Sequence, residues 1–128
     1  MRLLLDTHAF IWWMEGNTRL SRSARSAIVS AENSIFVSAA SAWEVSIKAN
    51  LGKLAGSELV ATDFSAHVAS QGFVGLDITL DHAERAGSLP GPATDPFDRM
   101  LIAQSHAENL TIVSNEKAFD SYGVTRLW

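Results

Sequence analysis

The sequence predicts an α/β protein in which a mostly parallel β-sheet is covered by helices on both faces. Short apolar runs alternate with longer segments of helical periodicity along the whole chain. This alternation is typical of parallel sheets, because each connection between parallel strands crosses back through a helix. The chain has 128 residues, of which 47% are hydrophobic. We therefore predict one compact domain, residues 1–128, with enough apolar material for a core.

The first half of the chain is predicted to contain two strands and three helices. The apolar run at 3–5 is the first strand, and Thr7 leads into a segment with apolar residues at helical spacing. Residues 20–31 are predicted to form the second helix, which has apolar residues along one face. Residues 35–37 are predicted to form the second strand. A third helix over 41–52 follows, where Gly52 is the expected stop.

The middle of the chain has weaker signals. Residues 58–70 have the periodicity of an amphipathic helix, and residues 73–76 are a short strand candidate. Residues 80–87 are expected to be helical. The segment 87–94 is rich in glycine and proline, so we expect a loop there.

The last part of the chain repeats the helix-then-strand order. An apolar helix is predicted to begin at Asp95-Pro96 and to run to about Glu108, followed by a strand at 110–113. A short turn or helix near 117–119 and an extended segment at 124–127 complete the chain. The whole order therefore matches a sheet built from helical crossovers.

Composition limits the class of protein and its location. The chain has no cysteine, so a metal could bind only through oxygen or imidazole, and a reducing compartment is the natural home. The N-terminal apolar run ends after three residues, far short of the roughly 20 needed to span a bilayer. We expect a cytoplasmic protein with no membrane association.

Three acidic residues are predicted to gather at one edge of the sheet. Asp6 comes directly after the first strand, Glu44 lies in the helix after the second, and Glu116 lies three residues past Val113. The carboxyl ends of parallel strands share an edge, where ligands of open α/β sheets bind. Two further acids, Asp95 and Asp98, lie in the first turn of the helix before the fourth strand, and only the fold decides whether that turn faces the same edge.

Each of these acids also has a purely structural explanation. Asp6 could cap the first helix. Ser41 and Glu44 have the spacing of a capping box, and Glu44 with Lys48 has the spacing of a helical ion pair. Asp95 before Pro96 matches a helix cap, Asp98 would be a favourable first-turn charge, and Glu116 could be a solvated surface charge. These roles do not explain why the carboxylates coincide at several strand ends.

Clustered carboxylates repel one another unless they are protonated or bridged by cations. Magnesium suits such a cluster, because it is a hard cation that accepts a few carboxylates and keeps several waters. Magnesium held there would support phosphoryl transfer, so a phosphodiesterase or a phosphatase is plausible. The net charge of −4 argues against a nucleic-acid partner, but bound cations reverse the local field.

Four segments of the chain resemble the PIN-domain nucleases, and among them the VapC-type toxins. They are Leu4–His8, Val37–Lys48, Asp95–Gln104 and Ile112–Phe119. The resemblance extends over essentially the whole chain. It implies a three-layer α/β/α sandwich, metal-dependent cleavage of RNA, a homodimer, and inhibition by a cognate antitoxin protein whose tail covers the site.

The same resemblance assigns roles to the acidic residues. Asp6, Glu44 and Asp98 match the first three metal-site acids of the family, and Asp95 is a neighbouring acid of this subgroup. Glu116 falls at the fourth position, where family members usually have aspartate, so its contact with metal could pass through a water. The implied cofactor is Mg²⁺, with Mn²⁺ as a possible substitute, and the implied reaction is hydrolysis of RNA phosphodiester bonds by metal-activated water.

Three other classes of protein remain as alternatives. A receiver-like signalling domain also binds magnesium, but it needs paired acids after strand one and an aspartate ending strand three, whereas Asp6 is followed by Thr7 and Asp77 does not clearly end a strand. A small dehalogenase-like phosphatase needs two acids one residue apart, and here His8 occupies the second position. An interaction module would leave the acidic cluster without a purpose.

Other residues have two interpretations each. Trp12 and Trp13 are adjacent, so we expect only one of them to face the core and the other to contact a partner protein. Arg99 and Lys48 lie beside the proposed acids. They could neutralise the site or contact the RNA backbone.

Overall fold

The computed structural model describes residues 1–53 and 58–128, apart from the side chain of Leu59. The described chain folds around a five-stranded sheet in the order β3-β2-β1-β4-β5. Its strands are β1 (Arg2–Leu5), β2 (Ser34–Ser38), β3 (Val74–Leu76), β4 (Thr111–Val113) and β5 (Arg126–Leu127). All four neighbouring pairs are parallel. The predicted parallel sheet is therefore confirmed, and it has no antiparallel strand among the described residues.

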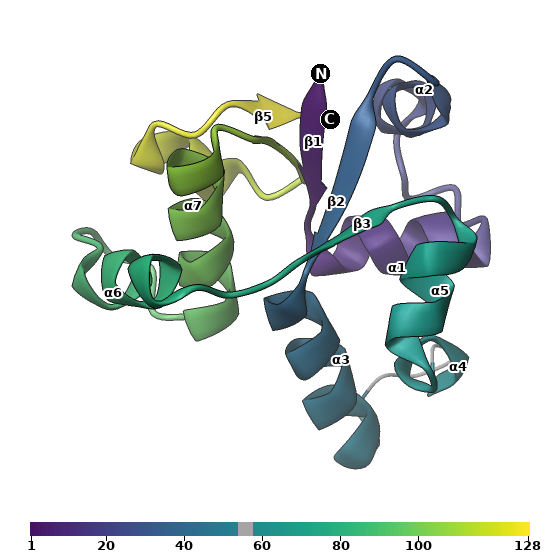
Figure 1. The fold of residues 1–128 in the computed structure, drawn as a ribbon, viewed down its shortest axis with the longest axis horizontal. Helices are drawn as coiled ribbons and strands as arrows, with labels where there is room; N and C mark the ends of the chain where they lie inside the picture. The colour runs from purple at the N-terminus through teal and green to yellow at the C-terminus, as the bar shows by residue number, and fades with distance from the viewer. Residues whose placement is uncertain (54–57) are drawn as a thin grey trace.

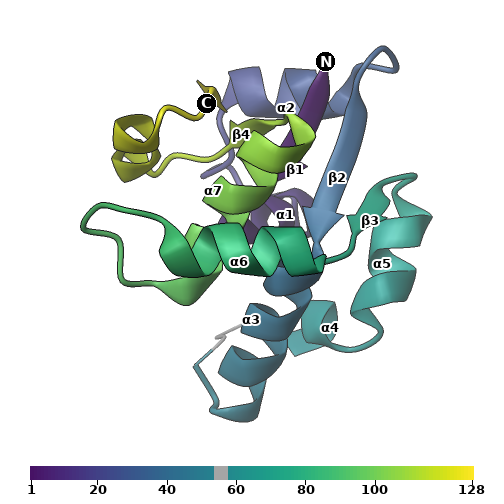
Figure 2. The same ribbon diagram turned by 60° about the vertical axis from the view of Figure 1, so that its left-hand side comes forward.

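Helices cover both faces of this sheet (Figure 1), which makes the three-layer α/β/α arrangement. Figures 1 and 2 show α6 and α7 on one side of the strands and α1, α2 and α5 on the other. The helices are α1 (Thr7–Glu15), α2 (Arg22–Val29), α3 (Ala39–Asn50), α4 (Glu58–Ala61), α5 (Phe64–Ser70), α6 (Leu80–Ser88), α7 (Pro96–Glu108) and the 3₁₀ helix η1 (Lys117–Tyr122). None of the helices in the described ranges has the length and apolar character needed to cross a membrane.

The central strand β1 is buried on both faces, which explains its continuous apolar sequence. Leu3 and Leu5 belong to the core that packs beneath α1, α2 and α3, while Leu4 between them belongs to the core beneath α7. All three are fully buried. The alternation follows from the two-residue period of a strand, so one apolar run supplies both cores.

Helix α3 begins earlier than the sequence predicted. Its N-cap is Ser38, whose Oγ accepts a hydrogen bond from the Ala40 amide at 3.0 Å. The expected start at Ser41 is wrong, because β2 ends at Ser38 and the chain turns into the helix at once. Ser41 is instead buried inside the helix, where its Oγ accepts a hydrogen bond from the Thr7 hydroxyl at 2.9 Å. This contact ties α3 to the start of α1.

The segment predicted as one helix over 58–70 is two helices, α4 and α5. The break lies at Asp63, whose φ of 52° is left-handed and cannot continue a helix. After the break, the ring of Phe64 packs with its centroid 5.0 Å from that of Phe10 in the core. Tertiary packing of this aromatic pair therefore overrides the local helical periodicity.

The expectation that only one of Trp12 and Trp13 would face the core is wrong. Both are half-buried and pack against the same core. Trp12 lies against Trp128, with ring centroids 5.9 Å apart, and Trp13 lies against Phe73 at 6.0 Å. The core extends around α1 because Trp128 covers one side of this helix and Phe73, in the segment before β3, covers the other.

Candidate functional site

Three strands end side by side and bring their acidic residues to one edge of the sheet. Leu5 pairs with Val37 of β2 and with Val113 of β4, so β1, β2 and β4 end at the same level. The Asp6 amide donates to the Val113 carbonyl at 3.1 Å, which holds the start of the first crossover against β4. The edge predicted from the strand ends is therefore present.

Asp6 is a buried carboxylate held by the start of α1. It is the N-cap of that helix, and its Oδ1 accepts a hydrogen bond from the Ala9 amide at 2.7 Å. Burial raises the pKa of Asp6, whereas hydrogen bonds from Ser114 and from the Ala9 amide lower it. His8 lowers this pKa further and Glu44 raises it. The capping role is confirmed, and it fixes the orientation of the carboxylate at the acidic edge.

Glu44 is buried on α3 and is paired with a lysine one turn later. Its Oε2 lies 2.7 Å from Lys48 Nζ, so the ion pair expected from their spacing is confirmed. Glu44 does not take part in a capping box, because the helix begins at Ala39. Lys48 therefore partly neutralises the edge and restrains Glu44.

Asp98 lies in the first turn of α7 and faces the same edge. Burial raises its pKa from 3.8 to about 7, and repulsion from other carboxylates adds to the rise. In decreasing order these carboxylates are Asp95, Glu44, Asp6 and Glu116. Within the described residues, the Asp98 carboxylate has no hydrogen-bond donor. It is thus a half-buried acid at the electrostatic centre of the cluster.

The two remaining acids make structural contacts of their own. Asp95 caps α7, with its Oδ1 accepting from the Phe97 and Asp98 amides at 2.8 and 3.1 Å. Pro96 follows at the first helical position, as expected. Glu116 is exposed, and its Oε1 accepts from the Ala118 amide at 3.1 Å at the start of η1. Both therefore have structural roles, while their charges still act on Asp98.

The donor set fits a hard divalent cation through its chemistry. The converging groups are carboxylates, and one of them, Asp98, has no hydrogen-bond donor in the part of the chain that the structure describes, while several others repel it. In the described ranges, no three acidic or histidine side chains lie close enough together to form a ready-made metal site. Cation binding would therefore require side-chain adjustment, while relieving the repulsion that the cluster now carries.

Two residues at this edge were missed or misread from the sequence. Ser114 is fully buried directly after β4, where it hydrogen-bonds to Asp6 and its Oγ accepts from the Glu116 amide at 2.9 Å. A small polar residue directly after a buried strand was the available signal. Asp77, which did not clearly end a strand in the sequence, directly follows Leu76, the last residue of β3.

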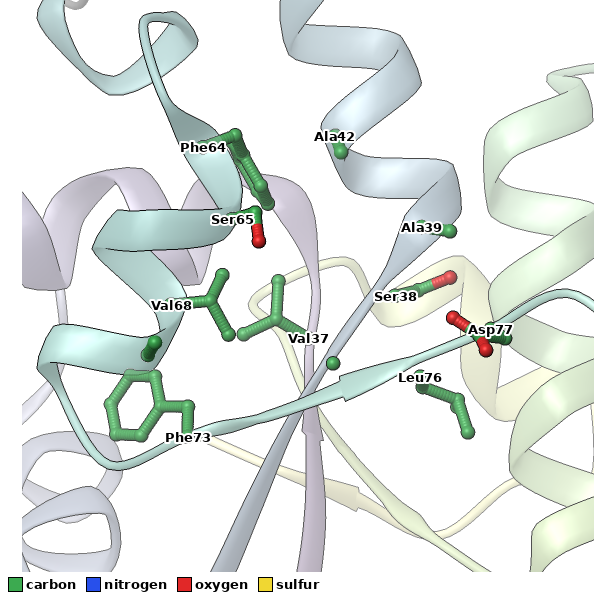
Figure 3. Close-up of a pocket in the computed structure, with 12 residues that line it drawn as sticks. Val37, Ser38, Ala39, Ala42, Phe64, Ser65, Val68, Phe73, Leu76 and Asp77 are labelled. Carbon is green, nitrogen blue, oxygen red and sulfur yellow. The ribbon is translucent and has the colours of Figure 1, made fainter.

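A cavity of about 320 Å³ opens next to this edge, between α3, α5 and β3. Figure 3 shows Phe64, Val68 and Phe73 at one end of the cavity and Ser38 and Asp77 at the other. The cavity is therefore mainly apolar, and it becomes polar where it meets the carboxyl end of the sheet.

These features define the class of protein as an α/β protein with an acidic site at the carboxyl edge of a parallel sheet. The model of one family, the PIN domain, matches residues 3–124. The chain belongs to the PIN domain family. A comparison with curated proteins finds no match.

Several solved structures share the fold over nearly their full length. A chain in the structure of VapBC2 from Rickettsia felis, bound to a DNA fragment from its promoter, is 15% identical, with a TM-score of 0.70 and coverage of 98% of this chain and 97% of that one. VapC20 from Mycobacterium tuberculosis, described as a toxin that cleaves the sarcin-ricin loop, is 16% identical, with a TM-score of 0.70 and 96% coverage of both chains. A chain of VapBC-1 from nontypeable Haemophilus influenzae is 14% identical, with a TM-score of 0.65 and coverage of 98% and 96%. At these identities the likeness establishes the fold alone.

Proposed function

We propose that this protein is a metal-dependent ribonuclease and the toxin component of a toxin–antitoxin pair. The observation that carries the proposal is the Asp98 carboxylate, which lies among four other acids at the active edge of a PIN fold, with no hydrogen-bond donor among the described residues. A toxin role and a nuclease activity are supported by the description of VapC20 as a toxin that cleaves the sarcin-ricin loop. Together, the fold and the cluster favour hydrolysis of a phosphodiester.

The acidic edge would hold Mg²⁺, or Mn²⁺ in its place, through Asp6 and Asp98, with Glu44 and Glu116 completing the site. A bound divalent cation supplies charge stabilisation for a phosphodiester and lowers the pKa of water. The protein residues orient the ligands: the Ala9 amide fixes Asp6, and Lys48 restrains Glu44. Glu44 would then accept a proton from the attacking water.

Glu116 and Asp95 have weaker positions in this site. Glu116 is exposed and caps η1, so its contact with metal would pass through a water, in keeping with its extra methylene. Asp95 acts mainly by capping the turn that contains Asp98. We therefore place Asp6 and Asp98 as direct ligands and the other acids in supporting roles.

The strand order weighs against the receiver alternative. Receiver domains have the order 2-1-3-4-5, whereas this sheet has the order β3-β2-β1-β4-β5. Strand order does not argue against the phosphatase alternative, which therefore has to be tested by activity. Turnover of a phosphate monoester by the purified protein, with no cleavage of RNA, would favour the phosphatase.

The test of the proposed function is cleavage of total RNA by purified protein loaded with Mg²⁺. We expect discrete fragments that disappear with EDTA and return when Mg²⁺ is added in excess. For substitutions of the site acids, Asp81→Asn is the matched control, because Asp81 is an exposed acid on α6 that pairs with Arg85 away from the cluster. No cleavage over a broad set of RNAs by antitoxin-free, metal-loaded protein would contradict the proposal.

Glu44→Gln is expected to lower the cleavage rate by roughly 100-fold, because the amide cannot accept a proton from water. The substitution preserves size, so the fold should survive. The measurement is single-turnover cleavage at saturating Mg²⁺, with the melting temperature as a check on folding. A cleavage rate equal to that of the wild type would show that Glu44 has no role in the reaction.

Mg²⁺ is expected to stabilise the protein more at about pH 8 than at about pH 6, because the cation must displace the proton from a carboxyl whose pKa is raised. The pKa of Asp98 is raised to about 7, so Asp98 is largely protonated below that value and competes with metal. The measurement is the shift in melting temperature on adding Mg²⁺ across this pH range. An equal shift at both ends would argue against Asp98 as a ligand.

We also propose a homodimer that forms through α3, α6 and the start of α7. Trp43 is 59% exposed and Leu80 is 90% exposed. An almost wholly apolar cavity of about 200 Å³ lies beside Trp43, lined also by Ile78, Phe97 and Met100. Exposed apolar side chains next to an apolar cavity are typical of surfaces that another protein covers.

Leu80→Asp is expected to convert the dimer to a monomer, because it places a charge in the apolar contact. Val29→Asp is the control, since Val29 is 65% exposed at the end of α2, on a different element. Sedimentation velocity distinguishes the two states. A monomeric wild-type protein, or a dimer that Leu80→Asp leaves intact, would contradict this interface.

An antitoxin partner is proposed on the same grounds as the toxin role. Chains of the same fold were solved in VapBC structures, and VapBC-5 from Mycobacterium tuberculosis is described as a member of a family of toxin-antitoxin systems. A protein that covers the acidic edge must bring positive charge to it, because burying several carboxylates without compensation is costly. We therefore expect a basic segment in the antitoxin.

A further inference from the structure

Arg99 follows Asp98 directly, yet its side chain is directed at the backbone of a loop. Its guanidinium donates to the carbonyls of Ala86 at 3.0 Å, Ala93 at 2.9 Å and Leu89 at 2.6 Å. A longer contact of 3.4 Å reaches the carbonyl of Gly87. Arg99 therefore bridges the last turn of α6, the loop at residues 89–95 (the α6–α7 loop) and the first turn of α7.

The α6–α7 loop is held from its other side by η1. The Ala93 amide donates to the Tyr122 hydroxyl oxygen at 2.6 Å. Gly91 has a φ of +105°, and a Cβ there would lie 2.9 Å from the Tyr122 ring, so the backbone approaches the ring more closely than any other residue would allow. Figure 2 shows this loop at the end of α6, below the yellow turn of η1.

The loop ends at the residue that fixes Asp98. Asp95 is the last loop residue, and its carboxylate accepts from the Asp98 amide at 3.1 Å. Asp98 is also repelled by the other carboxylates of the cluster, and this repulsion favours displacement of its side chain from the edge. The hydrogen bonds of Arg99 to the loop backbone oppose that displacement.

We propose that Arg99 is a positioning residue that holds Asp95 and Asp98 at the acidic edge through the α6–α7 loop. The proposal rests on the proposed function in taking Asp98 as a metal ligand. It replaces the interpretation of Arg99 as a contact to the RNA backbone, because the guanidinium is already committed to backbone carbonyls. An arginine suits this role because its five donors are spread over three nitrogens and reach carbonyls on different sides, whereas the three donors of a lysine share one nitrogen.

The test compares Arg99→Lys with Arg85→Lys. The control is the same chemical change at an exposed arginine of α6 that pairs with Asp81. In Arg99→Lys we expect faster hydrogen exchange at the Ala93 amide in the metal-free protein and a loss of Mg²⁺ affinity of roughly 10- to 100-fold, the usual effect of removing a group that orients a metal ligand. The rate constant for RNA cleavage falls, KM for RNA is unchanged, and the control behaves as the wild type.

Tyr122→Phe releases the loop from its other side and provides a second variant if Arg99→Lys fails to fold. It should change exchange and Mg²⁺ affinity in the same direction. Two results would overturn the proposal: unchanged Mg²⁺ affinity despite faster exchange of the loop, or a raised KM for RNA with unchanged Mg²⁺ affinity. If the wild type cleaves no RNA while exchange and Mg²⁺ affinity still change together, the positioning role stands and the ribonuclease assignment fails.

Discussion

Replacing Asp98 by asparagine is expected to abolish RNA cleavage while stabilising the metal-free protein. Loss of a direct metal ligand should lower the cleavage rate by at least about 100-fold, because even residues that only orient ligands contribute 10- to 100-fold. The stabilisation arises because Asp98 is half-buried and repelled by neighbouring carboxylates. Asparagine has nearly the same shape and carries no charge, so it removes the repulsion and leaves the packing.

The pH dependence of stability provides an independent check on this prediction. The pKa of Asp98 is raised from 3.8 to about 7 in the folded protein, so the folded state holds this proton more tightly than the unfolded state. Its stabilising contribution is complete below the unfolded pKa and is lost as the pH rises through about 7. Asp98→Asn should therefore raise the melting temperature more at alkaline than at acidic pH.

The measurement is a series of melting curves of metal-free wild type and Asp98→Asn across this pH range, together with cleavage assays. Asp81→Asn serves as the control, since Asp81 is an exposed acid outside the cluster. A stability difference that does not vary with pH would show that Asp98 is not a strained acid. If Asp98→Asn cleaves RNA at the rate of the wild type, Asp98 is not a metal ligand.

Local sequence was sufficient to predict β1, β2 and β4, because each of them contains a short, buried apolar run. The run Leu3–Leu5 is buried on both faces, so its sequence contains no competing polar pattern. The start of α3 could not be placed in the same way, since both Ser38 and Ser41 are good capping residues. The choice depends on where β2 stops pairing with its neighbours, which is a tertiary property.

The acidic edge was predictable because chain direction alone places strand ends together in a parallel sheet. The same reasoning places Asp6 and Glu44 at one edge from the sequence alone. The position of Asp98 could not be predicted from the sequence. Asp98 lies at the start of α7, which precedes β4, and only the packing of this helix decides where its first turn lies. The role of Arg99 was also hidden, since its hydrogen-bond acceptors are backbone carbonyls, which no residue pattern encodes.

Asp6 is expected to be indispensable for cleavage, whereas its effect on stability should depend on the residue that replaces it. Asp6 both caps α1 and lies at the acidic edge. Asparagine is as good a helix cap as aspartate, while alanine leaves the Ala9 amide and the buried Ser114 hydroxyl without their partner. We expect Asp6→Ala to lower the free energy of unfolding by about 1–3 kcal/mol and Asp6→Asn to leave it near that of the wild type.

Both substitutions remove the carboxylate, so both should lower the cleavage rate by at least about 100-fold. Urea unfolding and single-turnover cleavage of the same RNA separate the two roles, because stability distinguishes the variants while activity does not. Cleavage by Asp6→Asn with loss only in Asp6→Ala would mean that Asp6 is a helix cap and nothing more. The metal would then have to be bound without the residue that follows β1, and Asp98 would be the only direct ligand left of the two that we propose.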